Sequence, residues 1–308
     1  DSLNDNLPVG PATARSWRLC DDVRGQQMSS ALARAAISTD WGGRALASES
    51  DLYDPLHYNN GTVWPFVTGF LALAQYRYHN VYAAREQLEA IWRTGSLWGL
   101  GRNPEVFSGA AYEPLETAVP QQFFATSMAL TPYVRGALGL EADAPRGVLA
   151  LAPRLFDQPG TVGVRHIRVG AAVLDATFTV SDTAFRATVR RVRGGSALTL
   201  RFEPSLAPGA RVQSVTAGGR AVPYRTTSNG RAVLVAFEVP LGEGADVQVR
   251  HSGGWRLDPG GTPPDRGDRS RRLKVLDARV DDGTFVATLE GRAGVSYEIT
   301  IVRPGGRV

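Results

Sequence analysis

Residues 65–98 read PFVTGFLALAQYRYHNVYAAREQLEAIWRTGSLW and decide the fold of the first half of the chain. Pro65 suits the first turn of a helix, where its missing N–H leaves no hydrogen bond unmade. Residues 66–80 are apolar nearly all round, as in a helix buried between others. In residues 81–98 the apolar side chains recur at helical spacing and form one face. The stretch therefore predicts two consecutive helices.

Two further helices are predicted on either side of this pair. Residues 26–37 carry Met28, Leu32 and neighbouring alanines at helical spacing. Residues 121–138 predict a last helix, which we expect to be kinked at Pro132. The first half of the chain is therefore expected to be a helical domain, residues 1–145.

From residue 146 onward the pattern changes to short alternating runs, separated by Gly-Gly, Asn-Gly and Asp-Gly turns. Strands at this spacing predict an antiparallel β-sandwich over residues 146–256. Residues 257–272 are rich in Pro, Gly and charge, which predicts a linker. The strands of residues 273–308 then complete the sandwich or form an appendage to it. The fold class expected is α+β multidomain. The alternating runs are 161–169, 173–180, 184–192, 197–202, 231–239, 245–251, 283–291 and 295–302.

Composition and charge argue against several classes of protein. The 308 residues contain 43 % hydrophobic and 21 % charged side chains, which is ordinary for a globular protein. No apolar run is long enough to span a membrane, so we expect no membrane partner. Residues 1–145 carry 10 basic and 15 acidic side chains, a net of −5, and residues 146–308 carry 24 and 15, a net of +9. The basic side chains are scattered along the predicted strands, which favours a solvated β surface over nucleic-acid binding.

The sequence offers little for metal, cofactor or thiol chemistry. Cys20 is the only cysteine, so neither an internal disulfide nor a thiolate cluster is expected. The four histidines lie far apart and lack the spacing of metal ligands. No phosphate-binding loop and no G-x-S-x-G signature occurs. We therefore expect no metal and no cofactor.

Four loops of the helical half are rich in aromatic and polar residues and lie at or near the start of a helix. They are DWGGRAL (40–46), YDPLHYNNGTVWP (53–65), NPEVFSG (103–109) and AVPQQFF (118–124). Loops at one end of a helical bundle form a pocket, and helix N-termini favour polar ligands. Aromatic rings stack on the apolar face of a sugar, while Arg, Asn and Asp bind its hydroxyls. The loops contain these residue types at Trp41, Arg44, Tyr53, Tyr58, Asn59, Asn60 and Trp64. They predict a carbohydrate site, with packing between helices as the alternative for the two tryptophans.

The order of the motifs in these loops resembles that of a known family. Residues 3–155 are similar to the C-terminal part of the catalytic domain of bacterial amylo-α-1,6-glucosidase (glycogen-debranching) type glycoside hydrolases. The wider resemblance is to the six-hairpin, (α/α)6-barrel glycosidase superfamily. It implies a partial (α/α)6 toroid, about half a barrel, followed by the β-sandwich. The motifs that carry it are YDP at 53–55, YNNGTVWP at 58–65, PEVFSG at 104–109 and PQQFFATS at 120–127.

The resemblance implies an enzyme, a glycoside hydrolase that acts with inversion on an α-glucan or a related oligosaccharide. In such enzymes one carboxylic acid protonates the leaving oxygen and a second carboxylate, roughly 6.5–9.5 Å away, activates water. The Glu of the family's P-E motif is the expected base, and it corresponds to Glu105.

The same resemblance implies residues that bind substrate. Trp41 and Arg44 are expected in the pocket wall. Tyr58, Asn59 and Trp64 are expected to contact the sugar. Gln121 is expected to orient Glu105 or a sugar hydroxyl, with capping of the last helix as the alternative.

Two departures from the family pattern matter. Many relatives have Y-H-N-G where this chain has YNNG at 58–61, and the nearby His57 is shifted from that place. The family's general acid lies further upstream of the base than the 104 residues that precede Glu105. The acid is therefore expected outside this chain. Three local aspartates are weaker candidates: Asp5, Asp40 and Asp54.

The resemblance also bears on partners. Half a barrel leaves the inner faces of its helices without their apolar cover. We therefore expect an upstream barrel half, or self-association through this helical seam, besides an oligosaccharide or polysaccharide substrate. The chain opens on DSLNDN without Met, as in the middle of a longer protein. The compartment stays open, with the cytoplasm favoured because no leader is visible.

Two other functions remain open from the sequence. One is a remnant that binds carbohydrate without hydrolysing it. The other is a structural role, in which the sandwich serves only for packing or interaction.

Overall fold

The computed structural model describes residues 8–9, 12–13, 19–304 and 306–307. These residues form two compact units. Unit 1 comprises residues up to 136, 259–278 and 287–299, and unit 2 comprises residues 137–258, 279–286 and 300 onward. Within the described residues, no helix combines the length and the apolar character that crossing a membrane requires.

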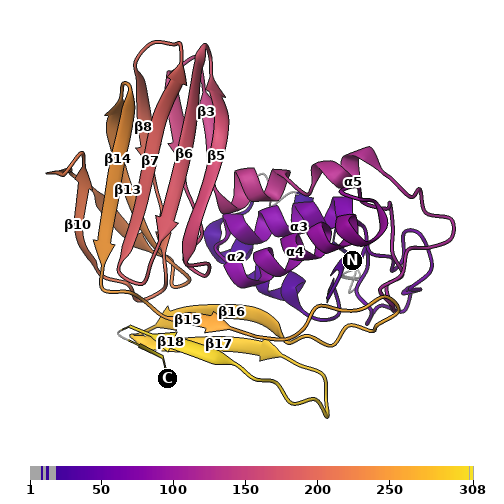
Figure 1. Ribbon diagram of the computed structural model, residues 1–308. Coiled ribbons are helices and arrows are strands. Elements are labelled where there is room, and N and C mark those ends of the chain that lie inside the picture. The colour runs from indigo at the N-terminus through magenta and orange to yellow at the C-terminus, as the bar shows by residue number, and fades with distance from the viewer. Residues whose placement is uncertain (1–7, 10–11, 14–18, 305, 308) are drawn as a thin grey trace. The chain divides into compact units, whose positions relative to one another are not determined.

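Unit 1 holds the helices of the chain (Figure 1). Helix α4 spans Val81–Trp98, which confirms the predicted range, and α3 begins at Pro65 as expected. Helix α3 is buried over most of its length, in agreement with its apolar sequence. The elements of this unit are α2 (Asp22–Ala33), α3 (Pro65–Arg77), α4 (Val81–Trp98), α5 (Phe123–Ser127), the π-helix η1 (Pro132–Ala137, whose last residue belongs to unit 2), β1 (Ser38–Thr39) and β2 (Gly42–Gly43).

Two predicted helices differ from the observed ones. Helix α2 begins four residues before the predicted start, because the Asp21 side chain caps it by accepting a hydrogen bond from the Arg24 amide at 2.9 Å. The helix expected over 121–138, with a kink at Pro132, is not continuous. It is divided into α5 and the π-helix η1, and the division falls just before Pro132, which has no N–H to continue the hydrogen-bond ladder.

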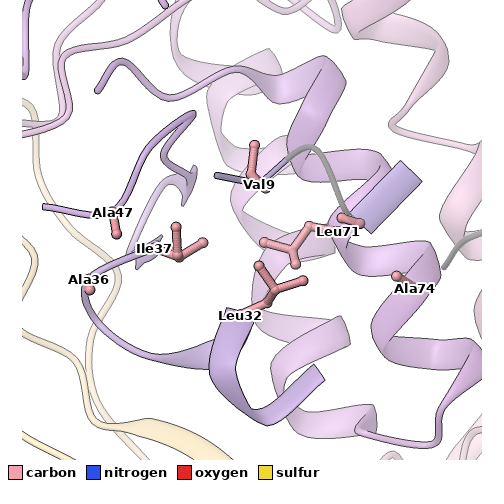
Figure 2. Packing of buried hydrophobic residues seen from close by; sticks show 8 residues of the cluster. Val9, Leu32, Ala36, Ile37, Ala47, Leu71 and Ala74 are labelled. Carbon is pink, nitrogen blue, oxygen red and sulfur yellow. The ribbon is translucent and has the colours of Figure 1, made fainter. Parts of the chain in front are cut away.

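A small apolar core packs α2 and α3 against the loop that follows α2 (Figure 2). Leu32, Ile37 and Leu71 are almost completely buried and point toward one another. Burial of such side chains stabilises by about 1.5–3 kcal/mol each. The core positions the segment 38–46, which follows directly from Ile37. A half-toroid arrangement of these helices stays a prediction.

Unit 2 contains two sheets whose strands are mostly antiparallel (Figure 1). The first has the order β11-β10-β14-β7-β6-β5, and the second has the order β12-β13-β8-β4-β3, with β9 paired to β13. One pair, β4 with β8, is parallel. The strands of the first sheet are β5 (Gly160–Val169), β6 (Ala172–Val180), β7 (Ala184–Arg193), β10 (Val212–Ala217), β11 (Arg220–Ala221) and β14 (Gly244–His251). Those of the second are β3 (Leu140–Asp143), β4 (Val148–Leu151), β8 (Leu198–Phe202), β9 (Ser205–Leu206), β12 (Arg225–Ser228) and β13 (Val233–Leu241).

Aromatic side chains join the two sheets of unit 2. Phe185 on β7 lies 5.9 Å from Phe202 on β8, measured between ring centroids. Phe178 extends the row within the first sheet and Phe237 within the second. Rows of this kind form the core of a sandwich whose inward residues alternate with solvated ones.

Among the residues that the structure describes, the C-terminal strands pair with one another, β18 with β15 and β19, and β16 with β17. The expected strand over 295–302 is shorter, since regular pairing begins only at Thr300. The segment 259–272, which lies within the expected linker, belongs to unit 1. These strands are β15 (Arg256–Asp258), β16 (Lys274–Asp281), β17 (Thr284–Glu290), β18 (Thr300–Arg303) and β19 (Gly306–Arg307).

Candidate functional site

Three of the four polar loops of unit 1 meet through backbone hydrogen bonds around Val63. The Val63 amide donates to the Phe107 carbonyl at 2.9 Å, and the Phe107 amide donates to the Val63 carbonyl at 2.8 Å. A further isolated β-bridge joins Val63 to Arg44. Because the 53–65 and 103–109 loops are paired at these positions, Tyr58 and Glu105 come together although 47 residues separate them.

The Glu105 carboxylate is held mainly through one of its oxygens. The Tyr58 hydroxyl donates to Oε1 at 2.5 Å, and the Gln122 side-chain amide donates to the same oxygen at 2.8 Å. The Val119 amide reaches Oε2 only at 3.4 Å. Glu105 is partly exposed. The arrangement orients a carboxylate and leaves one oxygen weakly bonded.

Gln122, not the predicted Gln121, contacts Glu105. Gln122 is buried, and its backbone amide donates to the Asn103 carbonyl at 2.9 Å. Gln121 is exposed and accepts a hydrogen bond from Arg102. The residue that orients Glu105 is therefore one position later than expected. Because the backbone at Gln122 is extended, the side chains of Gln121 and Gln122 point to different sides.

Asn103 fixes this arrangement to α4. Its side-chain nitrogen donates to the Ile91 carbonyl at 2.7 Å and to the Thr94 hydroxyl at 2.6 Å. Asn103 is buried. Sequence reasoning missed both Asn103 and Gln122. The adjacent glutamines at 121–122 offered two candidates, and nothing local distinguished them.

Tyr58 also contacts Trp64 within its own loop. Their ring centroids lie 4.4 Å apart in an edge-to-face arrangement. The Trp64 indole N–H donates to the Tyr58 carbonyl at 3.1 Å and to the Thr62 hydroxyl at 3.0 Å. The Trp64 N–H is thus satisfied locally, and the residue is partly exposed. The structure therefore brings Tyr58 and Trp64 together with Glu105, and their contact with a sugar stays a prediction.

Trp41 and Arg44 lie inside unit 1 and not on its surface. Trp41 is 1 % exposed, and its indole N–H donates to the Ser108 carbonyl at 2.9 Å. Arg44 is buried and donates to the Gly109 carbonyl at 2.8 Å and to the Ala35 carbonyl at 2.6 Å. Their burial corrects the expectation of a pocket wall. Both residues instead support the loop that follows Glu105 from beneath.

The other candidates have different surroundings. Asn59 is exposed, and its backbone amide donates to Nδ1 of His57 at 3.3 Å. The Asp54 carboxylate accepts from the Leu56 amide at 2.9 Å and so closes a turn. Asp5 lies outside the described residues. Within the described part of the chain, no three His, Cys, Asp or Glu side chains are grouped so as to hold a metal ion.

Asp40 belongs to a buried charge cluster. Its carboxylate accepts from Lys274 Nζ at 2.7 Å and from the Arg271 amide at 2.8 Å, and the same ammonium group contacts Glu86 at 2.5 Å. Asp40 and Lys274 are almost completely buried. Asp40 is therefore committed to an ion pair that anchors segment 259–278 within unit 1.

The pH dependence of unit 1 is expected to report this ion pair. Burial raises the pKa of Asp40, but the charge of Lys274 and the amides of Arg271 and Arg272 outweigh that effect and hold it at about 2. Because this pKa lies below the ordinary value of 3.8, the ionised carboxylate stabilises unit 1 above about pH 4 and this stabilisation is lost as the pH falls toward about 2. Urea unfolding across this window should show the loss, and Asp40→Asn should flatten it, whereas the exposed control Asp51→Asn should not. Equal slopes for all three proteins would contradict the pairing.

Gly109 allows the 53–65 and 103–109 loops to approach, and Gly61 allows the 53–65 loop to fold closely on itself. A Cβ atom on Gly109 would lie 2.1 Å from the Gly61 carbonyl oxygen and 2.8 Å from the Tyr53 hydroxyl. One on Gly61 would lie 2.4 Å from the Asp54 carbonyl oxygen. Since backbone atoms are among the obstacles, a side chain at Gly109 would push the two loops apart, and one at Gly61 would distort the 53–65 loop.

Replacing Gly109 by Ala is expected to lower the free energy of unfolding by about 1–3 kcal/mol, the usual cost of an overpacked site. Denaturant unfolding measures the change. Gly242→Ala is the matched control, because a Cβ there meets no atom within 4 Å. A Gly109→Ala protein as stable as the Gly242→Ala protein would show that the loops do not meet in this way.

Titration of Tyr58 is expected to report its bond to Glu105. The hydrogen bond from its hydroxyl to Glu105 raises the pKa of Tyr58 to about 12. Glu105→Gln removes the charged acceptor, so the pKa of Tyr58 should fall toward the ordinary value of 10.0. NMR of tyrosines labelled at ring Cζ follows the ionisation. A Tyr58 resonance with the same midpoint in both proteins would contradict the contact.

Comparisons with known proteins add two weak similarities. No protein-family model matches the chain, and no curated protein matches it. A GH127 β-L-arabinofuranosidase from Geobacillus stearothermophilus T6 is similar in structure, with a TM-score of 0.40 and 11 % identity over 96 % of this chain and 56 % of that one. A protein described as a glycoside hydrolase has a TM-score of 0.35 and 10 % identity over 86 % of this chain and 53 % of its own.

The chain thus spans about half the length of these solved structures. At such TM-scores and identities the similarity assigns neither a family nor an activity. The function has to be argued from the residues around Glu105.

Proposed function

We propose that the protein is a glycoside hydrolase in which Glu105 is the general base. The observation that carries the proposal is the hydrogen bonding of its carboxylate. Tyr58 and Gln122 both donate to Oε1, while Oε2 has only the long contact to the Val119 amide. A base needs a fixed orientation and one oxygen within hydrogen-bond reach of the proton that it removes. The order of the sequence motifs around Glu105 supports the same role.

The reaction we propose is hydrolysis with inversion. Water attacks the anomeric carbon, Glu105 takes a proton from that water, and the bond to the leaving oxygen breaks. A general acid gives a proton to the leaving oxygen, so the anomeric carbon and the leaving alcohol each gain one new hydroxyl. Asp40 is buried and paired with Lys274, so it is not available as the acid. Asp54 accepts from the Leu56 amide through Oδ1 in a turn, and no described contact joins it to the Glu105 cluster. We propose that the acid comes from a further part of the protein.

The substrate we propose is an α-glucan or a related oligosaccharide. Tyr58 and Trp64 would contact its rings, and Asn59, which is exposed beside them, would contact a hydroxyl. The debranching type of activity rests on the resemblance of the sequence motifs alone.

A second candidate is binding of carbohydrate without hydrolysis. It is favoured by exposed aromatic rings on the short helix that follows Gln122. Phe123 is 87 % exposed and Phe124 is 43 % exposed. Such rings give sugars a stacking surface whether or not a base is present.

Oligosaccharide hydrolysis distinguishes the two candidates. The protein, with and without any coding sequence that precedes residue 1, is incubated with maltohexaose, a branched α-glucan and an arabino-oligosaccharide. The proposal predicts release of reducing ends, and ¹H NMR in the first minutes should show the product with the anomeric configuration opposite to that of the cleaved bond. Binding without release of reducing ends in every form would support the second candidate, and retained configuration would contradict Glu105 as a base.

A further inference from the structure

A hollow with a volume of about 650 Å³ lies in unit 1, between the second half of α4 and the segment 263–266. Ligand sites commonly occupy about 300–1,000 Å³. Its lining shares no residue with the Glu105 cluster. We propose that this hollow is a second binding site, for a neutral oligosaccharide.

Two indole rings give the hollow its apolar surface. Trp92 and Trp98 both line it. The Trp92 N–H donates to the Ala129 carbonyl at 2.7 Å, and 42 % of the residue is exposed. Since its N–H is already bonded, Trp92 presents mainly its ring. Trp98 is fixed by edge-to-face packing on Phe107 at 5.2 Å and on Tyr112 at 4.8 Å between ring centroids. Rigid rings suit the C–H face of a pyranose.

The charges that line the hollow are balanced. Glu89 and Asp265 oppose Arg93 and Arg266, so the lining favours neither an anion nor a cation. Nε of Arg266 donates to both oxygens of the Glu113 carboxylate, to Oε1 at 3.0 Å and to Oε2 at 2.8 Å. A neutral ligand with many hydroxyls fits this balance better than a charged one.

Hydrogen-bonding capacity remains on both walls of the hollow. On the α4 wall, Glu89 contacts the Arg85 and Arg93 guanidinium groups only at 3.8 and 3.9 Å, beyond hydrogen-bond length. On the opposite wall, Asp265 is exposed. Carboxylates placed beside aromatic rings are the groups that sugar hydroxyls require.

The wall formed by residues 263–266 is held in place. The Tyr112 amide donates to the Asp268 carbonyl at 2.9 Å, and the Gly267 amide donates to the Tyr112 carbonyl at 3.1 Å. Pro263 and Pro264 restrict the backbone of the wall further. A preformed wall lowers the entropy lost when a ligand binds.

Calorimetric titration and tryptophan fluorescence test the site with five neutral probes: maltohexaose, cellohexaose, xylohexaose, mannohexaose and chitohexaose. At least one probe should bind. Asp265→Asn should weaken that binding about tenfold, as expected for a lost bond to a charged acceptor. Trp92→Phe should weaken it at least fivefold and remove part of the fluorescence change. Asp51→Asn, an exposed acid of unit 1 outside the hollow, should bind as the unmodified protein does.

The result that overturns the inference is the absence of binding for all five probes, or equal affinity in the Asp265→Asn, Trp92→Phe and Asp51→Asn proteins. Urea unfolding of each variant shows whether it is folded. The outcome is separate from the role of Glu105. Binding that depends on Trp92 and Asp265 would stand even if no probe were hydrolysed, and hydrolysis without such binding would leave only the Glu105 proposal.

Discussion

Replacing Lys274 by Met is expected to lower the free energy of unfolding of unit 1 by about 3–5 kcal/mol. Lys274 is 1 % exposed, and its ammonium group contacts both Asp40 and Glu86. Methionine keeps most of the side-chain volume but removes the charge. The loss should be large because Asp40, which is completely buried, would be left without its counter-ion.

Arg34→Met is the matched control for this prediction. Arg34 contacts Glu49 at 2.7 Å, but both side chains are well exposed. Exposed pairs contribute about 0–1 kcal/mol because water solvates the partner that remains. Urea unfolding followed by tryptophan fluorescence reports mainly unit 1, which contains Trp41, Trp64, Trp92 and Trp98. Equal losses for the two variants would show that the buried cluster does not anchor segment 259–278.

Local sequence patterns did not predict the buried charge cluster of Asp40, Glu86 and Lys274. The α3 and α4 helices are predictable because their apolar spacing repeats every turn, and most strands of unit 2 are predictable because their side chains alternate. Asp40 and Lys274 are 234 residues apart and share no periodic pattern. The composition of residues 257–272 predicted a linker, whereas residues 270–272 bond to Asp40 through one hydroxyl and two backbone amides.

The candidate site was predicted in part. The motif loops indicated Tyr58, Trp64 and Glu105, and the structure brings these three together. Trp41 has the residue type of a sugar-stacking group, but only the three-dimensional arrangement shows that it is buried beneath Ser108. Whether an aromatic ring packs inside or faces solvent depends on contacts distant in sequence, which residue type alone does not encode.

Replacing Glu105 by Gln is expected to reduce oligosaccharide hydrolysis about 10²–10⁴-fold, the usual contribution of a general base. Glutamine keeps the size and the carbonyl oxygen of the side chain, so the contacts to Tyr58 and Gln122 can be kept. It cannot accept the proton of the attacking water. Substrate affinity should therefore change much less than the turnover rate.

Glu116→Gln is the matched control for Glu105→Gln. Glu116 is an exposed acid of the same unit, eleven positions along the chain. Its replacement removes the same charge from a side chain that takes no part in the contacts of Glu105. We expect this variant to hydrolyse at the rate of the unmodified protein.

The rate at which reducing ends appear, compared between the unmodified protein and Glu105→Gln at saturating oligosaccharide, measures the role of Glu105 directly. We expect hydrolysis by the unmodified protein, in the form that includes any preceding coding sequence, and by Glu116→Gln. Glu105→Gln should be at least a hundredfold slower. Equal rates for Glu105→Gln and the unmodified protein, or no hydrolysis by any form, would contradict that role.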